Sequence, residues 1–424
     1  MDERIYREYV AILKEELQPA MGCTEPIAVA YSAALARKTL GALPETVEVL
    51  ASANIIKNVK SVIVPNTNGQ RGIAAAAAAG IVSGNADAQL QVLASLTPEQ
   101  VDAVGAYLQQ AAFTVRRADK DYVFDIQVRV TVGADSASVE IAGYHTNVIR
   151  IEKNGVVQFH KDYQESGSQH ATDRSLLTVE QIIAFANEVD IADVQETLQR
   201  QIDYNWAIAE EGLRGDYGAN IGRILLQSYG MSIHNRAKAY AAAGSDARMN
   251  GCDLPVVINS GSGNQGLTAS LPVIVYAKEL GVTQQMLYRA LVVSNLVTIH
   301  LKTGIGSLSA YCGATAAGCG AAAGVTYLYG GQFREIAHTI VNAIAIDSGM
   351  ICDGAKASCA AKIASAVEAG LLGMQMQMHE SQFYGGDGIV VKGVENTIRN
   401  IGTLASEGMR ETDRTIIRMM IQEH

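Results

Sequence analysis

The sequence is short of proline, of large aromatic residues and of basic charge. Its 424 residues include 7 prolines, 6 phenylalanines and a single tryptophan, and 43 acidic residues outnumber 33 lysines and arginines. The net charge of −10 argues against nucleic acid or an anionic membrane as the partner, because both attract basic surfaces. Charged residues make up 18% of the chain and hydrophobic residues 48%, which describes a folded globular protein rather than a disordered one.

Long hydrophobic runs are also missing. The longest charge-free stretch, residues 303–333, is mostly glycine, alanine and serine, too weakly apolar for a membrane span, and we expect buried helix there. The chain opens with MDERIYREYVAILKEEL, an amphipathic helix pattern without the basic segment and apolar core of a secretory signal. These absences predict a cytoplasmic protein that does not enter the membrane.

Cysteine is scarce and unevenly placed. In a reducing compartment the six cysteines are not expected to form disulfides, so each is a buried small hydrophobe, a metal ligand or a nucleophile. Four of them fall within residues 312–359, which favours a shared role. The cysteines are Cys23, Cys252, Cys312, Cys319, Cys352 and Cys359.

Hydrophobic periodicity divides the chain into a mixed first half and a helical second half. Helix patterns in the first half cover residues 3–17, 24–37, 72–84 and 95–112, with strand patterns at 45–55 and 61–69. Residues 122–160 alternate and predict an antiparallel three-stranded meander, followed by a polar loop at 161–175. We therefore expect an α+β fold, with a mixed region over 1–175 and an all-helical domain over 176–424.

Two segments of the second half, AYCGATAAGCGAAAG and GMICDGAKASCAAK, each hold two cysteines seven residues apart. On a helix this spacing is nearly two turns, so both members of a pair would share one face. Neither pair has zinc-knuckle spacing or a histidine at finger spacing, which gives structural zinc little support. Thiolates from two segments suit an iron–sulfur cluster, although spacing alone leaves open the alternative of buried structural cysteines.

Longer motifs carry a family resemblance. GCTEPIAVA near the N-terminus, NIIKNV followed by VP within residues 54–65, LSAYCGATAAGCGAAAG and GMICDGAKASCAAK together resemble the L-cysteine desulfidase family. That family belongs to the serine dehydratase alpha-chain group of iron–sulfur enzymes. The resemblance spans nearly the whole chain and implies a helical cluster-binding domain of the serine dehydratase alpha-chain type.

The resemblance also implies the site. Cys312, Cys352 and Cys359 match the cysteines that hold a 4Fe–4S cluster in this group, with Cys319 as the substitute for Cys312. Three thiolates on four irons leave one iron open to substrate as a Lewis acid. The implied reaction is β-elimination of L-cysteine to pyruvate, ammonia and hydrogen sulfide, with Cys23 as the proton acceptor.

The residues around Cys23 favour a reactive thiol on physical grounds. If Thr24 caps the helix that follows, with residues 24–37 packing toward the site, Pro26 falls in its first turn, where its missing N–H costs nothing. Free backbone N–H groups and the positive helix end would then favour a thiolate at Cys23. Glu25 would either stabilise the first turn or hold the substrate ammonium group.

A glycine-rich loop is the candidate for binding the substrate carboxylate. INSGSGNQGLTASLP, residues 258–272, offers backbone N–H groups, hydroxyls and amides ahead of a helix, as phosphate loops do. It is neither a Walker A nor a Rossmann motif, and the alternative is a flexible interhelix loop. The candidate substrate ligands here are Ser260, Ser262, Asn264 and Gln265.

Other polar residues are further candidates. Asn54, Lys57 and Asn58 would share one helix face, which either reaches the site and binds substrate or is solvated. His300 fits a buried structural histidine better than a catalyst. Lys356 raises the alternative of a pyridoxal phosphate (PLP) enzyme, and the helical second half argues against that cofactor.

Three functions remain open at this point. The first is cysteine desulfidation, the second is dehydration of L-serine by the same elimination, and the third is a non-enzymatic iron–sulfur or redox-sensing protein in which Cys23 is the sensor thiol. In the enzymatic cases the partner is a small amino-acid substrate, without nucleic acid or membrane. A homo-oligomer, by default a homodimer, is expected from base rates.

Overall fold

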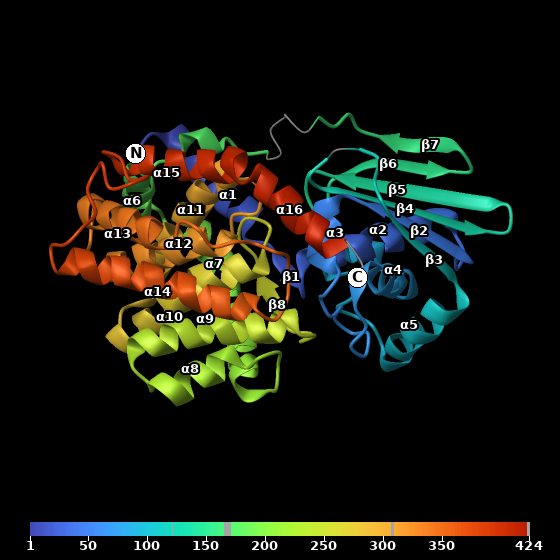
Figure 1. Ribbon diagram of the computed structural model, residues 1–424, viewed down its shortest axis with the longest axis horizontal. Helices are drawn as coiled ribbons and strands as arrows, with labels where there is room; N and C mark the ends of the chain where they lie inside the picture. The colour runs from blue at the N-terminus through green and yellow to red at the C-terminus, as the bar shows by residue number, and fades with distance from the viewer. Residues whose placement is uncertain (121, 165–170, 307–308, 422–424) are drawn as a thin grey trace.

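The computed structural model describes residues 1–120, 122–164, 171–306 and 309–421. Figure 1 shows a body containing a β-sheet beside a helical body, with the C-terminal helix reaching from one to the other. The fold is α+β, as the sequence predicts. Among the described residues, no helix is long and apolar enough to cross a membrane.

The sheet body is built on six strands within the described residues, in the spatial order β3-β2-β4-β5-β6-β7. β2 and β3 run parallel, and every other neighbouring pair in this sheet is antiparallel. The strands are β2 (Thr46–Ala51), β3 (Ala112–Arg117), β4 (Asp125–Val132), β5 (Asp135–Ala142), β6 (Val148–Lys153) and β7 (Val156–His160). Alternate residues such as Val47, Val49 and Val128 are buried under helices, which produces the period-2 pattern of the sequence.

The prediction of a three-stranded meander is wrong, because the meander has one more strand. Residues 136–155, expected as one strand, are interrupted by a turn that separates β5 from β6, so the meander has four strands. Gly143 adopts a φ of +83° in this turn, and Asn147 Nδ2 closes it by donating to the carbonyl oxygen of Ala142 (2.8 Å). The sequence also missed β3, and the strand expected at 61–69 is reduced to an isolated bridge.

One face of the sheet is covered by helices. α2 (Thr24–Leu40) and α4 (Gly72–Ser83) pack on it, and α5 (Pro98–Gln110) packs beside α4. α2 and α4 approach so closely that a Cβ atom on Gly80 would lie 1.9 Å from the carbonyl oxygen of Ala30. Thr97 caps α5 with a capping box.

The N-terminal segment packs with the helical body. α1 (Glu3–Glu16) buries Tyr9, Ile12 and Leu13 in the helical core. β1 (Pro19–Met21) pairs antiparallel with β8 (Pro255–Val257), so the second half contains a short strand that the sequence did not predict. The division expected at residue 175 stays a prediction. In space, α1 and β1 lie with the helices.

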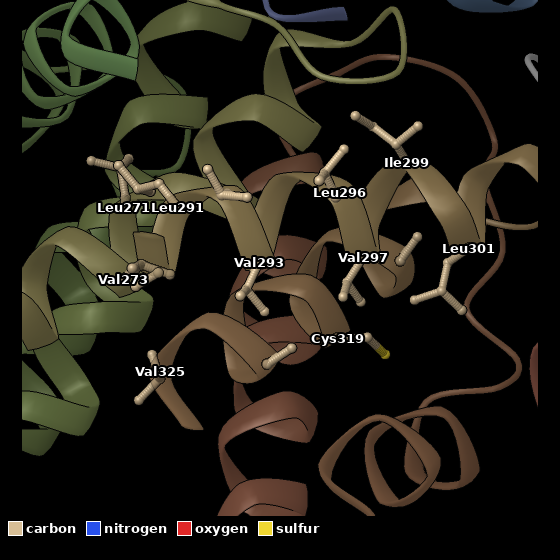
Figure 2. Close-up of a cluster of buried hydrophobic side chains, with 14 of the residues drawn as sticks. Leu271, Val273, Leu291, Val293, Leu296, Val297, Ile299, Leu301, Cys319 and Val325 are labelled. Carbon is tan, nitrogen blue, oxygen red and sulfur yellow. The ribbon is translucent and has the colours of Figure 1, made fainter. Parts of the chain in front are cut away.

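The helical body is arranged around α12 (Gly313–Leu328), which is buried along almost its whole length. Gly318, Gly320 and Gly324 face neighbouring helices so closely that a Cβ atom on any of them would clash with a backbone oxygen. Figure 2 shows Cys319 of α12 within a cluster of leucine and valine side chains from α10 and α11. The buried helix expected in the charge-free segment is α12, and residues 307–308 of that segment lie outside the described residues.

The other helices complete the two bodies. They are α3 (Ala53–Val59), α6 (Val179–Glu188), α7 (Ile191–Arg214), α8 (Ile221–Tyr229), α9 (Ile233–Met249), α10 (Gly263–Leu280), α11 (Gln284–Ile305), α13 (Phe333–Ile346), α14 (Cys359–Met378), α15 (Val394–Thr403) and α16 (Arg410–Ile421). α9, α15 and α16 fall within the region expected to be all-helical, although no separate pattern marked their positions in the sequence. α9 is buried on nearly all sides over its second half, so its pattern shows no polar face there. In the expected loop at 161–175, residues 165–170 lie outside the described residues.

Candidate active site

Three cysteines from separate segments meet at the start of α12. Cys312 is the residue before α12, Cys352 lies in the loop after α13, and Cys359 opens α14. The backbone N–H of Cys312 donates to Met350 O (3.0 Å) and that of Cys352 to Ala310 O (2.7 Å), so two of these segments are tied together. The role of the three thiols as cluster ligands stays a prediction.

The three thiols influence one another and lie near two lysines. A side-chain hydrogen bond with Cys312, assisted by Lys57 and Lys302, lowers the pKa of Cys352 to about 6 in spite of its burial. The same hydrogen bond and burial raise the pKa of Cys312, and burial raises that of Cys359. Cys312 and Cys352 therefore titrate as a pair, and a single thiolate shared by this pair is favoured near neutral pH.

Cys23 reaches the same place from the other end of the chain. It is the residue before α2, and it is 2% exposed. It packs with Val62 and Met249 in a small buried cluster that Cys359 borders. The fold thus brings the predicted base next to one of the predicted cluster ligands.

The thiol of Cys23 is paired with Glu25, and its surroundings favour the protonated form. Its Sγ donates to Glu25 Oε2 (3.1 Å), and burial, together with the charge of Glu25, raises its pKa well above the usual value against the opposing effect of Arg248. The thiolate expected from a helix start is therefore wrong for this site. The helix cap is Cys23 itself, and Thr24, inside the helix, donates to a carbonyl oxygen of the 258–272 loop (2.9 Å).

Glu25 is the acceptor in contact with this thiol. Its Oε2 accepts from Cys23 (3.1 Å), and its Oε1 accepts from Asn58 Nδ2 (3.1 Å). Thr24 Oγ1 also lies 3.1 Å from Oε2, but its one proton is directed to the closer Gly261 O (2.9 Å). Burial raises the pKa of the carboxyl, but His145 and the hydrogen bond from Cys23 outweigh burial, so the pKa is lowered overall. An ionised carboxylate held against a thiol can take the thiol proton.

A cavity of about 1530 Å³ opens beside this pair, with walls from both bodies. Its lining includes Glu25, Phe124 and His145 from the sheet side and Lys302 from the helical side. Four of the predicted substrate residues also line it: Asn54, Ser260, Ser262 and Gln265. The loop at 258–272 is therefore part of a built wall, rather than a free interhelix loop.

Several buried polar atoms at this cavity have no hydrogen-bond partner within the described residues. They include Asn54 Oδ1, His145 Nε2 and Gln265 Oε1. Arg248, 2% exposed, likewise has an unpartnered Nε; it does not line the cavity, but its charge acts on Cys23 and Glu25. Because buried polar groups are nearly always paired, the unpartnered atoms of the lining indicate that the cavity takes polar ligands or ordered water.

The face of α3 that carries Asn54, Lys57 and Asn58 is buried, which excludes the solvated alternative. Lys57 Nζ pairs with Asp413 Oδ1 of α16 (2.6 Å), and its side chain is 2% exposed. Asn58 supports Glu25 as described above. Of the three, Asn54 alone lines the cavity, so the other two support the site from behind.

Sequence reasoning missed two residues of the site, Arg248 and His145. Arg248 lies at the end of α9, where the packing is so tight that a Cβ atom on Gly263 would lie 2.2 Å from its Nε. The signal in the sequence that could have pointed to Arg248 was an arginine among the small residues of the stretch AAAGSDARM. His145 lies in the turn that was expected to be strand, and its ring packs edge-on against Phe124, with centroids 4.9 Å apart.

Cys23 and the predicted cluster ligands Cys312, Cys352 and Cys359 do not line the cavity, and the remaining candidates also lie away from it. Cys319 and Cys252 are buried in the helical core. His300 is paired with a glutamate of α15 (2.7 Å), and Lys356 with the aspartate that follows Cys352 (2.6 Å). Asn264 faces the sulfur of Met249 (3.4 Å) and does not line the cavity.

The donor set fits an iron–sulfur centre better than a single metal ion. Within the part of the chain that the structure describes, no three His, Cys, Asp or Glu side chains converge on a point that could hold one ion. A cubane cluster binds each thiolate to a different iron, so it needs thiols that are close without sharing one point. Three half-buried thiols beside two lysines supply soft ligands and offset the negative charge of such a cluster.

Comparison with known proteins identifies the family. A family model described as serine dehydratase alpha chain matches residues 87–418. The chain belongs to the serine dehydratase alpha-chain family. Membership supports a lyase of the dehydratase type, in a family known for iron–sulfur dependence.

Curated relatives of this serine dehydratase-like chain share its whole length. It is 57% identical to a UPF0597 protein of Desulfitobacterium hafniense over 421 residues, 99% of this chain and 98% of that protein. It is 49% identical to a UPF0597 protein of Lachnoclostridium phytofermentans over 417 residues, 98% of this chain and 100% of that protein. A UPF0597 protein of Treponema denticola is 44% identical over 429 residues, with both chains fully covered.

Proposed function

We propose that the chain is an iron–sulfur-dependent lyase that converts L-cysteine and water to pyruvate, ammonium and hydrogen sulfide by β-elimination. The observation that carries this proposal is the placement of Cys23 against Cys359, near the Cys312–Cys352 pair and beside a polar cavity. A reducing cytoplasm and a homo-oligomer remain the expected setting.

An amino-acid substrate needs opposite charges for its two ends. Ser262 precedes α10 without a side-chain cap, so the first N–H groups of that helix are free for a carboxylate, and Arg248 adds a buried positive charge beside Gly263. The ammonium group needs acceptors. The unpartnered oxygens of Asn54 and Gln265 in the cavity wall support that role.

The proton chemistry is assigned to Cys23 and Glu25. In the empty site the raised pKa of Cys23 and the lowered pKa of Glu25 oppose proton transfer between them, so the positive charge of the substrate ammonium group must favour the thiolate when substrate binds. Glu25 then takes the thiol proton, and the thiolate of Cys23 accepts the Cα proton of the substrate. The electron pair from the Cα–H bond forms the Cα–Cβ double bond, the Cβ–S pair leaves with sulfur as hydrosulfide, and the proton on Glu25 passes to it to give hydrogen sulfide. The resulting aminoacrylate tautomerises and is hydrolysed by water to pyruvate and ammonium.

Cys312, Cys352 and Cys359 are the residues that would hold a 4Fe–4S cluster. When bound, such a cluster supplies an iron without a protein ligand as a Lewis acid. The donor chemistry of the three thiols and the nearby Lys57 and Lys302 support this assignment.

A second candidate function is L-serine dehydration. It is favoured by the description of the matching family model as serine dehydratase alpha chain. The same residues would remove the Cα proton, and hydroxide would leave Cβ in place of hydrosulfide. The relative turnover of the two amino acids distinguishes the two functions.

The direct test is anaerobic purification, iron and sulfide analysis, and assays with L-cysteine and L-serine. We expect an iron-containing protein that releases sulfide from L-cysteine. Cys352→Ser should lose both iron and turnover, whereas Cys319→Ala, a buried cysteine on the helix that follows Cys312, should keep both. An iron-free protein that turns over cysteine only with added PLP would contradict the proposal. An iron protein without turnover of either amino acid would support the sensing alternative.

The role of Cys23 has its own test. Cys23→Ala should retain the iron content of the wild type and lose turnover by roughly 10²–10⁴-fold, because the proton acceptor is removed. Loss of iron in this variant would instead make Cys23 a cluster ligand. Iron analysis and turnover of the same preparation decide between these roles.

A further inference from the structure

The turn that carries Ser260 has a conformation that needs support. Asn259 and Ser262 exchange two backbone hydrogen bonds (3.1 and 3.0 Å). The residues between them, Ser260 and Gly261, have φ values of +50° and +73°. Serine rarely adopts this left-handed conformation, because its Cβ crowds the backbone. Surrounding contacts must therefore hold the turn in place.

Three fully buried amides support the turn from behind. They are Gln201 on α7, Asn295 on α11 and Asn259 in the turn itself. Gln201 and Asn295 exchange two hydrogen bonds (3.0 and 2.8 Å), and Asn259 Nδ2 donates to Asn295 Oδ1 (2.9 Å). The hydroxyl of Ser260 donates to Asn259 Oδ1 (2.8 Å). This amide chain runs from the helical core to the cavity wall.

One backbone carbonyl fixes the direction of every bond in the amide chain. Asn295 Nδ2 donates to Leu291 O (2.9 Å), an atom that can only accept. Asn295 must therefore present its oxygen to Asn259 Nδ2, and this turns the oxygen of Asn259 toward Ser260. The Ser260 hydroxyl has to donate inward, so its oxygen offers lone pairs, and no proton, to the cavity.

The opposite side of the turn is fixed to the helix of the predicted base. Thr24 Oγ1 donates to Gly261 O (2.9 Å), and Thr24 follows Cys23 directly. The position of the Ser260 oxygen is thereby set relative to Cys23. A strained turn held from two sides has little freedom to rotate its hydroxyl toward another ligand group.

We propose that the amide chain Gln201–Asn295–Asn259 positions Ser260 as an acceptor for the ammonium group of an amino-acid ligand. This rests on the proposed function, in that the cavity takes an amino acid, and it replaces the sequence-based expectation that Ser260 binds the carboxylate. The amides are positioning residues that select ligands with an ammonium group over plain carboxylic acids. A carboxylic acid without that group would leave this half-buried acceptor without a ligand partner.

The test compares two probes that cannot undergo elimination, L-alanine and propionate. Calorimetry on the anaerobically purified protein should show that the wild type binds L-alanine at least about tenfold more tightly than propionate. The double variant Gln201→Met/Asn295→Leu replaces both amides by apolar groups of similar size, so neither is left unpaired. It should lose about tenfold in L-alanine affinity, with propionate affinity unchanged.

Two further variants keep the test decisive. Thr298→Val is an isosteric control on α11, one turn beyond Asn295, whose hydroxyl bonds within the helix to Ser294 O (2.8 Å), and it should bind both probes as the wild type does. If the double variant does not fold, Ser260→Ala removes the acceptor itself and should show the same selective loss.

The outcomes separate this inference from the proposed function. An unchanged preference for L-alanine in the double variant and in Ser260→Ala overturns the inference, even if the wild type eliminates sulfide from cysteine. Equal wild-type binding of the two probes overturns it as well. Selective L-alanine binding that depends on the amide chain, without turnover of cysteine or serine, supports the inference and refutes the proposed function.

Discussion

At the scale of single residues, burial outweighs local helix effects on ionisation. The N-terminal end of α2 should favour a thiolate at Cys23, but a helix end contributes at most about 2 kcal/mol. Desolvation and the neighbouring charge of Glu25 act in the opposite direction and keep the thiol protonated. The sequence shows that a helix begins here but not how deeply its start is buried. It could therefore predict the place of the thiol and not its charge.

Asp246 gives a prediction on pH and stability. Its side chain is 1% exposed, and burial raises its pKa to about 6 although the N–H of Gly222 donates to it (3.2 Å). Because the folded pKa lies above the ordinary 3.8, the stability this carboxyl contributes is full below about pH 4 and is lost as pH rises through 6. As pH rises across this window, the free energy of unfolding of Asp246→Asn should increase by up to about 3 kcal/mol relative to that of the wild type.

The control for this prediction is Thr298→Val, which removes a buried hydroxyl and no ionisable group. Its effect on the free energy of unfolding should not vary across the same range of pH. Urea denaturation at several pH values measures both variants. A constant difference between Asp246→Asn and the wild type would show that the folded protein does not raise the pKa of Asp246.

At the scale of elements, glycines decide how closely helices pack. A Cβ atom on Gly80 of α4 would lie 1.9 Å from the carbonyl oxygen of Ala30 in α2, so Gly80→Ala should destabilise the protein by roughly 2–3 kcal/mol. Gly105→Ala in α5 is the matched control, because nothing lies within 4 Å of its added Cβ. It should stabilise by about 0.5–1 kcal/mol through helix propensity. Chemical denaturation of both variants tests the packing, and equal effects would contradict it.

Helices and strands with a clear hydrophobic periodicity of their own could be predicted from sequence. The amphipathic α1 was expected to within a residue of its observed end, and β4 was expected from its alternation. β1 could not be, because its three residues form a strand only by pairing with β8, which lies far along the chain. The alanine-rich, buried end of α9 lacks a polar face for the same kind of reason. Such elements are defined by their neighbours, which a local pattern does not contain.

The candidate site also contains residues that the sequence predicted and residues that it did not. Long cysteine motifs predicted that Cys312, Cys352 and Cys359 would be grouped, and the structure places them together. Arg248 and the amide chain behind Ser260 were not predicted, because their roles come from contacts between distant segments. A buried amide has no sequence signature of its own. Its direction follows from the atoms around it, as Leu291 O shows for Asn295.

At the scale of the whole molecule, the C-terminal helix joins the two bodies. α16 packs against α3 of the sheet body, and Figure 1 shows it crossing from the helical body. Asp413 of α16 pairs with the buried Lys57 (2.6 Å), and Lys60 Nζ donates to Met420 O (2.9 Å). Because Asp413 also lines the cavity, this crossing closes one side of the candidate active site.

The buried ion pair of Lys57 and Asp413 leads to a prediction about the stability of this junction. Asp413→Ala leaves the ammonium of Lys57, 2% exposed, without its carboxylate and should cost roughly 3 kcal/mol of unfolding free energy. Replacing both residues, as Lys57→Met/Asp413→Leu, should recover most of this loss, because no buried charge remains. Glu411→Ala, with a side chain 72% exposed on the same helix, should stay within about 0.5 kcal/mol of the wild type.

The same variants test whether the pair couples the bodies. Trp206, the single tryptophan, lies on α7 and reports the helical body by fluorescence, whereas far-ultraviolet circular dichroism reports both bodies. In Asp413→Ala the two denaturation curves should separate, since weakening the junction lets one body unfold before the other. In Glu411→Ala they should coincide as in the wild type. If Asp413→Ala and Glu411→Ala behave alike by both probes, the buried pair does not hold α16 on α3, and the junction depends on the apolar contacts of the helix.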